Sequence, residues 1–101
     1  MEIINSDVFE KTIKEGVTLV DFFATWCGPC KMLGPVLEEL STEMTDVKFV
    51  KVDVDDNPEL AEKFGIMSIP SVFLFKNGEV AGSFLGLRSK ENVKAFIEER
   101  K

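Results

Sequence analysis

Histidine and tyrosine are absent from this 101-residue sequence, tryptophan occurs once and cysteine only twice. A structural zinc site takes four ligands, usually Cys or His, so this chain could supply only half of one from those residue types. A metal site would have to be shared between two chains or completed by carboxylates. We therefore expect no metal.

Long apolar runs are also absent. No stretch reaches the ~18 residues that a membrane-spanning helix needs. The first residues, MEIINSDVFEK, lack the basic start and the apolar core of a signal peptide. We therefore expect a cytoplasmic protein without membrane contact. In that compartment structural disulfides are rare, and a close cysteine pair is more often catalytic or metal-binding.

Positive charge is in short supply, because 12 Lys and Arg face 18 Asp and Glu, which gives a net charge of −6 and a pI near 4.6. Binding to nucleic acid needs clustered Lys and Arg, so we expect no such partner. The acidic residues are spread along the chain, which indicates a solvated surface. The length suits one domain with its own core, and we expect residues 1–101 to form a single, monomeric domain.

The two cysteines, Cys27 and Cys30, lie in the stretch DFFATWCGPCKML, with only Gly28 and Pro29 between them. They could be a structural staple, half of a metal site, or a redox centre. A disulfide stabilises chiefly by closing a loop in the unfolded chain, and a loop of about four residues contributes only about 2 kcal/mol in that model. A loop of about fifty residues would contribute roughly 4 kcal/mol. The sequence therefore favours chemistry over a staple.

Hydrophobic periodicity and turn residues predict strand, helix, strand, helix, strand, helix, strand, strand, helix. Helix crossovers imply parallel pairing of the early strands, and the tight turn at Asn77-Gly78 forces antiparallel pairing of the last two. We therefore predict an α/β fold, with a central mixed five-stranded sheet flanked by four helices on both faces. The expected strands are residues 1–5, 17–24 and 47–54 and the hairpin 71–85; the expected helices begin near residues 7, 27, 58 and 89.

Local signals mark the helix ends and the buried faces. Ser6 or Asp7 is expected to cap the first helix, where Asp7 and Glu10 match a capping box. Asn57 is expected to cap the third helix, and Pro35 should kink the second. The positions expected to face the core are Phe9, Ile13, Leu33, Val36, Leu37, Leu40, Met44, Val93, Phe96 and Ile97.

Cys27 follows a predicted strand and opens a predicted helix, whose unpaired N–H groups and positive dipole end stabilise a thiolate. Cys30 lies three residues further, in the first turn and beneath Cys27. We expect Cys27 to be the exposed, nucleophilic sulfur and Cys30 the sheltered sulfur that completes the exchange. Pro29 suits a first-turn position and stiffens the intervening pair.

Two charged residues fall where a core is expected. Asp21 interrupts the apolar run LVDFFA, and burial without a partner raises the pKa of a carboxyl group. Lys51 shares a strand face with Phe49 on the strand expected to lie beside Asp21. Our hypothesis is that Asp21, tuned by Lys51, exchanges a proton with Cys30 during the redox cycle. The alternative is that Asp21 sits near a strand end and Lys51 extends to solvent.

The motif WCGPC after an apolar strand, an acid six residues before the first cysteine, and the later stretch IPSVFLFKNGE together resemble the thioredoxin family over essentially the whole chain. A CxxC beside a βαβ pattern is itself a feature by which thioredoxin-like proteins are identified. The resemblance implies a thioredoxin fold and a thiol-disulfide oxidoreductase that reduces disulfides of target proteins. It also implies that Cys27 attacks, that Cys30 resolves, and that a thioredoxin reductase using flavin and NADPH regenerates the dithiol. No cofactor would bind this chain.

The resemblance also assigns supporting residues. Asp21 and Lys51 occupy the buried acid and lysine positions of the family. Pro70 matches a cis-proline that faces the active site, and the backbone of Ile69 would pair with an extended substrate strand. The apolar patch on which targets dock would be Trp26, Gly28, Pro29, Ile69, Pro70, Gly86 and Leu87. Considered alone, Trp26 could instead be a core residue and Gly86 a strand end.

Some positions depart from the family pattern. Phe23 stands where relatives often carry a second tryptophan, and Thr25 where a charged or small residue is common. Met67 and Leu87 should make the docking rim more apolar. Two other functions remain open: a disulfide oxidase or isomerase, whose members usually carry His or another dipeptide between the cysteines, and a binding module that holds a partner without turnover.

Overall fold

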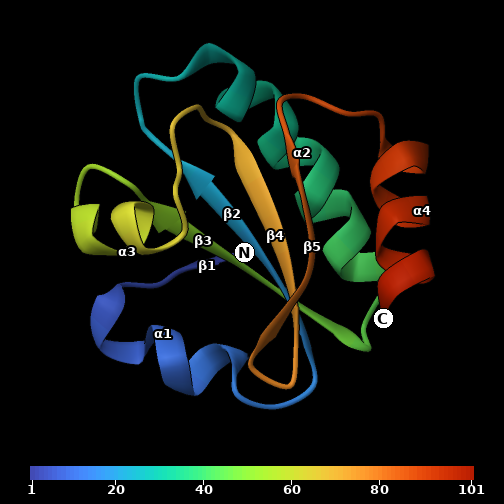
Figure 1. Cartoon of the computed structure of the whole chain (residues 1–101). Helices are drawn as coiled ribbons and strands as arrows, with labels where there is room; N and C mark the ends of the chain where they lie inside the picture. Colours follow the sequence, from blue (N-terminus) through green and yellow to red (C-terminus); the bar gives the residue numbers. More distant parts are fainter.

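The computed structural model describes residues 1–101, and its helices and strands follow the predicted order (Figure 1). The strands are β1 (Glu2–Ile3), β2 (Val17–Phe23), β3 (Val47–Asp53), β4 (Ser71–Lys76) and β5 (Glu79–Leu85). The helices are α1 (Ser6–Ile13), α2 (Gly28–Glu43), α3 (Pro58–Lys63) and α4 (Lys90–Arg100). None of these helices has the length and hydrophobicity that crossing a membrane requires.

The five strands form one mixed sheet in the order β1-β3-β2-β4-β5. β3 pairs in parallel with β1 and β2, and β4 pairs antiparallel with β2 and β5. The central strand β2 is buried at six of its seven residues, as expected for an almost continuous apolar run covered on both faces. The predicted mixed sheet is confirmed.

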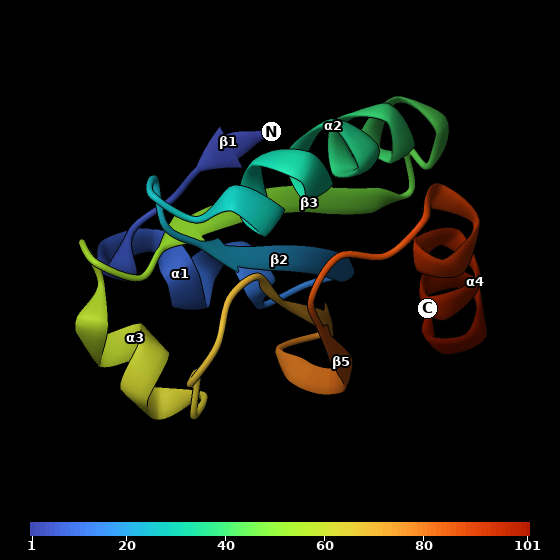
Figure 2. The same cartoon turned by 90° about the horizontal axis from the view of Figure 1, so that it is seen from above.

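Helices cover both faces of this sheet, with α1 and α3 on one side and α2 and α4 on the other (Figure 1). Seen from above, α2 lies over β3 and β2 (Figure 2). Alternate side chains of β2 supply both cores: Leu19 packs with residues of α2 and α4, and Val20 and Phe22 pack with residues of α1 and α3. All the predicted core positions are buried except Val36, which is half-buried.

The predicted cap of α1 is wrong, whereas Asn57 directly precedes α3 at the N-cap position, as predicted, but without a side-chain capping bond. Asn5, not Ser6 or Asp7, caps α1, because its side chain accepts a hydrogen bond from the Asp7 backbone N–H at 3.0 Å. Asn57 makes no capping bond to α3. Its side-chain oxygen accepts from the backbone N–H and the hydroxyl of Ser6 instead, both at 3.0 Å. Asn57 therefore ties the start of α1 to the start of α3.

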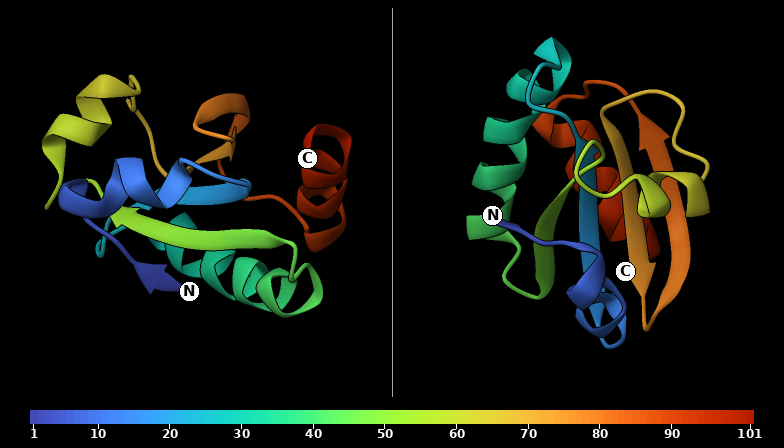
Figure 3. Two further views of the ribbon diagram at one scale, coloured as in Figure 1. Left: turned by 90° about the horizontal axis from the view of Figure 1, so that it is seen from below. Right: turned by 90° about the vertical axis from the view of Figure 1, so that its left-hand side faces the viewer.

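The hairpin turn between β4 and β5 follows the prediction. Asn77 and Gly78 have φ angles of 50° and 88°, so both turn residues lie in the positive-φ region that a type I′ turn requires. The hairpin turn lies at one end of the sheet. The loop before α2, the loop after α3 and the segment between β5 and α4 gather at the opposite end (Figure 3, right).

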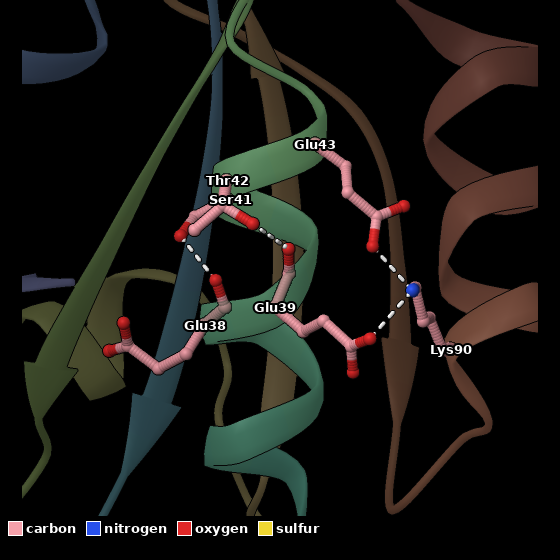
Figure 4. A network of polar contacts seen from close by, with 6 residues as sticks. All are labelled: Glu38, Glu39, Ser41, Thr42, Glu43 and Lys90. Carbon is pink, nitrogen blue, oxygen red and sulfur yellow. Dashed lines mark hydrogen bonds and ion pairs between the residues drawn. The ribbon is translucent and has the colours of Figure 1, made fainter.

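A polar network on the surface joins α2 to α4. Lys90, the first residue of α4, pairs with Glu39 at 2.8 Å and with Glu43, and these carboxylates are one turn apart on α2 (Figure 4). The hydroxyls of Ser41 and Thr42 donate to the backbone carbonyls of Glu38 and Glu39 on the same helix. Hydrogen bonds from the Lys90 ammonium to both carboxylates raise the pKa of Lys90.

Candidate active site

Cys27 is the N-cap of α2, directly after the loop that follows β2. Its sulfur accepts a hydrogen bond from the backbone N–H of Cys30 at 3.2 Å, and the two residues form a disulfide with Cα atoms 5.3 Å apart. Gly28 and Pro29 occupy the first two helical positions and are exposed. The unpaired N–H groups and positive dipole end of α2 thus lie at Cys27, which favours negative charge on its sulfur.

The predicted difference in exposure between the cysteines is not found in this disulfide state. Cys27 is 4% exposed and Cys30 is 6% exposed. Both pack in a small cluster with Phe23 and Ala24, at the point where β2 ends. The Cys27 sulfur also lies 3.8 Å from the backbone oxygen of Ile69, so the segment before Pro70 covers it. In the disulfide, the Cys27 sulfur is therefore enclosed by Cys30, Phe23, Ala24 and the backbone of Ile69.

Asp21 is fully buried in the middle of the sheet, and neither of its carboxylate oxygens has a hydrogen-bond partner. Because side chains alternate along a strand, Asp21 points to the same face as Leu19 and Phe23, which pack against α2 and the cysteines. Burial raises the pKa of Asp21 from 3.8 to about 6, and the positive charge of Lys51 offsets part of this rise. Asp21 lies two residues before the end of β2, but its side chain does not reach solvent.

Lys51 is the direct neighbour of Asp21 across the β2–β3 pair, as the predicted adjacency required. It is half-buried, and its ammonium nitrogen lies 4.2 Å from the centre of the Phe23 ring. Phe23 in turn packs against both cysteines. The ring of Phe23 thus connects the lysine to the disulfide through packing and a cation–π contact.

Trp26 is 69% exposed, which excludes a role as a core residue. Its indole N–H donates to a carboxylate oxygen of Asp55 at 2.8 Å. The sequence reasoning missed Asp55, although a signal was present. Asp55 follows β3 and Trp26 follows β2, and the carboxyl ends of neighbouring parallel strands meet at one edge of a sheet.

The other predicted docking residues meet Trp26 at the same end of the sheet. The Ile69–Pro70 peptide bond is cis, as the resemblance implied. The backbone N–H of Gly86 donates to the oxygen of Pro70 at 2.8 Å, and Gly86 has a φ of 82°, a conformation that favours glycine. Leu87 is 44% exposed, whereas Ile69 and Gly86 are half-buried and Pro70 is buried. Pro70 therefore supports the patch from below.

An apolar pocket of about 240 Å³ opens beside Trp26. It runs from the loop after β3, along α3, to the segment before Pro70, and its lining is Trp26, Val54, Pro58, Ala61, Ile66, Met67, Ser68 and Ile69. Met67 is 97% exposed, which agrees with the expectation of a more apolar rim. Nowhere in the chain do three Cys, Asp or Glu side chains gather as a metal site would need.

Comparison with known proteins gives consistent matches over almost the whole chain. The family model described as Thioredoxin matches residues 1–99. A Bacillus subtilis protein described as thioredoxin is 51% identical over 90 residues, which cover 88% of this chain and 86% of the relative. A Chlamydia muridarum thioredoxin is 46% identical over 97 residues (96% and 95%), and one from Listeria monocytogenes is 48% identical over 95 residues (93% and 92%).

Proposed function

The chain belongs to the thioredoxin family and is a protein-disulfide reductase, and from this premise we propose a role for each residue of its site. The observation that carries the proposal is the position of Cys27 as the N-cap of α2, bonded to Cys30 one turn further. A thiolate at the start of a helix is stabilised by the helix dipole, and the thiolate is the attacking species in disulfide exchange.

In the proposed cycle the Cys27 thiolate attacks one sulfur of a target disulfide. A bond forms between Cys27 and that sulfur, the target S–S bond breaks, and the other target sulfur leaves as a thiolate that takes up a proton. The Cys30 thiolate then attacks Cys27, which releases the second target sulfur and forms the Cys27–Cys30 disulfide. Two electrons pass from the cysteine pair to the target.

Asp21 is proposed to accept the proton of Cys30 before this second attack. Its side chain lies on the sheet face that the cysteines cover, and its pKa of about 6 suits a base that works near neutral pH. Lys51 is proposed to tune Asp21 from the next strand, because its positive charge lowers the raised pKa of the carboxyl group. Without this charge Asp21 would hold its proton more tightly.

Trp26, Ile69, Pro70, Gly86 and Leu87 are proposed to bind the target. An extended target segment would pair with the backbone of Ile69. Because the Cys27 sulfur lies 3.8 Å from the Ile69 oxygen, this pairing would place the target disulfide beside Cys27. Gly28 and Pro29, the first two residues of α2, are proposed to form the part of the docking surface next to Cys27, since both are exposed.

The proposed partners are disulfide-containing proteins and a thioredoxin reductase that returns the dithiol form. We further propose that residues 1–101 act as one monomeric domain in the cytoplasm, without a cofactor or metal of their own. The acidic composition supports a surface that is not built for nucleic acid or anionic membrane.

The proposed role of Cys27 is tested by insulin reduction with dithiothreitol as the electron donor. Cys27→Ser should abolish the protein-dependent rate, because no thiolate remains at the start of α2. Cys30→Ser, reduced beforehand and freed of dithiothreitol, should instead accumulate a mixed disulfide with insulin, visible by mass on a non-reducing gel. If Cys27→Ser kept its activity, the assigned nucleophile would be wrong. If Cys27→Ser still captured targets, a binding module would be favoured.

A further inference from the structure

The four methionines of this chain differ sharply in their access to solvent. Met44 is 5% exposed and Met32 is 63% exposed, whereas Met67 is 97% exposed and is the most exposed of the large hydrophobic residues. An apolar side chain left in water to that extent does not contribute to the core. Its thioether sulfur is instead open to any dissolved oxidant.

Met67 also lies at a position where its polarity matters. It lines the apolar pocket together with Trp26 and Ile69, and it precedes by two residues the Ile69 oxygen that lies 3.8 Å from the Cys27 sulfur. Six of the eight residues that line this pocket are hydrophobic. A target that docks across Trp26 and Ile69 would therefore remove the Met67 side chain from water.

We propose that Met67 is an oxidation site for peroxides, and that its sulfoxide form weakens the docking of protein targets. In this reaction a lone pair of the Met67 sulfur attacks one peroxide oxygen, an S–O bond forms, and the O–O bond breaks. For hydrogen peroxide the displaced hydroxide takes up the proton of the transferred oxygen and leaves as water. The sulfur is oxidised by two electrons and the peroxide is reduced by two.

The sulfoxide changes the docking surface without touching the cysteine pair. A sulfoxide carries a strong hydrogen-bond acceptor, and the only side-chain donors in the pocket lining are the hydroxyl of Ser68 and the indole N–H of Trp26, which already donates to Asp55. Burying that oxygen under a target side chain costs free energy, because its bonds to water are lost. This inference rests on the proposed docking role of Trp26 and Ile69.

In the disulfide form of the protein, the Met67 sulfur can react with peroxide and the cysteine sulfurs cannot. The sulfurs of Cys27 and Cys30 are bonded to each other and buried, so they are not free to react with peroxide. A thioether does not titrate, so its reaction does not depend on forming a thiolate, as that of a cysteine does. Peroxide would thus oxidise Met67 on the docking surface, while the disulfide protects Cys27 and Cys30 from oxidation.

The test treats the disulfide form of the full chain with hydrogen peroxide, removes the peroxide, and measures insulin reduction with dithiothreitol. The peptide that contains Met67 should gain one oxygen atom by mass spectrometry. The kcat/KM for insulin should fall about tenfold, through KM rather than kcat, as expected for burying a polar group without a partner. Reduction of cystamine, a small disulfide without any peptide segment that could dock in the pocket, should keep its rate.

Two variants identify the residue responsible, each compared with its own untreated sample. Met67→Leu should lose no insulin activity on peroxide treatment, because leucine has no sulfur. Met32→Leu is the matched control, since Met32 is also exposed but does not line the pocket. It should lose activity as the native chain does. Met67→Gln, which places a permanent hydrogen-bond acceptor at this position, should raise the KM for insulin without peroxide.

The proposal is overturned if Met67 gains oxygen and the KM for insulin does not change, or if Met67→Leu loses as much activity as the native chain. It is also overturned if peroxide oxidises Met32 and leaves Met67 intact. None of these outcomes affects the assignment of the nucleophile, because that depends on the untreated Cys27→Ser protein. Conversely, an untreated Cys27→Ser protein that reduced insulin would refute the proposed function directly.

Discussion

Asp21 and Lys90 both lie next to α2, Asp21 on the sheet beneath it and Lys90 on the neighbouring helix α4. Their surroundings differ, because Lys90 has partners of opposite charge and Asp21 has no hydrogen-bond partner. Lys90 is paired with two carboxylates at the surface. Asp21 is fully buried and its oxygens have no hydrogen-bond partner. The positive charge that lowers the pKa of Asp21 is that of Lys51, on the next strand. The Lys51 ammonium lies over the Phe23 ring and forms no ion pair with Asp21.

The comparison indicates that the charge of Lys90 contributes to the fold, whereas that of Asp21 contributes to the reaction. An exposed ion pair contributes little, because water already stabilises both partners. A buried carboxyl without partners lowers stability whenever it is ionised, so its presence beneath the disulfide requires another reason. The proposed proton exchange with Cys30 provides one.

The largest expected effect is on stability, through Asp21→Asn. The pKa of Asp21 is raised from 3.8 to about 6 in the fold, so the native state holds this proton more tightly than the unfolded chain does. The stability that this proton provides is complete below pH 3.8 and is lost as the pH rises through about 6. A difference of about two units corresponds to about 3 kcal/mol. The unfolding free energy of Asp21→Asn should therefore gain that amount relative to the native chain over this pH range, measured by urea denaturation.

A matched control for this experiment lies on the same strand. Thr18 is fully buried, and its hydroxyl oxygen also has no hydrogen-bond partner, but it carries no charge. Thr18→Val should change the unfolding free energy by the same amount at every pH. If the advantage of Asp21→Asn were equally independent of pH, Asp21 would not titrate in this range and the contrast with Lys90 would fail.

The second prediction concerns the pH dependence of the reaction. If Asp21 takes the proton of Cys30, the rate of the resolving step should rise with pH through about 6 in the native chain and should lack this rise in Asp21→Asn. The loss should be roughly a hundredfold near neutral pH, at the low end of what a positioned base contributes. Single-turnover insulin reduction, followed by the fluorescence of Trp26, measures this step. Identical pH profiles for the two proteins would refute the proton transfer.

Replacing Lys51 by Met should sharpen the contrast further. The positive charge of Lys51 lowers the pKa of Asp21, so its removal should move that pKa above about 6, by roughly one unit. The carboxyl carbon of Asp21, followed by NMR as the pH is changed, measures the shift. Lys48→Met is the control, because Lys48 lies on the same strand and its ammonium instead donates to the backbone oxygen of Thr12. An Asp21 titration unchanged in Lys51→Met would show that the lysine does not tune it.

Much of this contrast was predictable from the sequence, because it depends on local patterns. The apolar run around Asp21 predicted a covered central strand, and the order of elements predicted that Lys51 would lie beside it. The turn at Asn77 was likewise set by its neighbour Gly78. The covered strand and the turn are each decided by residues within one element, and the position of Lys51 follows from the adjacent right-handed crossover that joins two parallel strands.

The features that could not be predicted depend on contacts between distant parts of the chain. Asn57 has the local sequence of a helix cap, but Ser6, 51 residues away, takes its side-chain oxygen. Asp55 meets Trp26 across 29 residues. The burial of Cys27 depends on Ile69, 42 residues later. These contacts form only when the segments that follow β1, β2 and β3 and the segment before Pro70 come together.

The smallest effect is expected at the surface network of Lys90, Glu39 and Glu43. Lys90→Ala should lower the unfolding temperature only slightly, because Lys90, Glu39 and Glu43 are already hydrated in the unfolded chain. The decrease should shrink in high salt, which screens exposed charges. Lys94→Ala is the matched control, since Lys94 is exposed on the same helix and forms no ion pair. A loss for Lys90→Ala as large as the gain for Asp21→Asn would mean that the paired network, and not only the buried acid, governs the stability of α2.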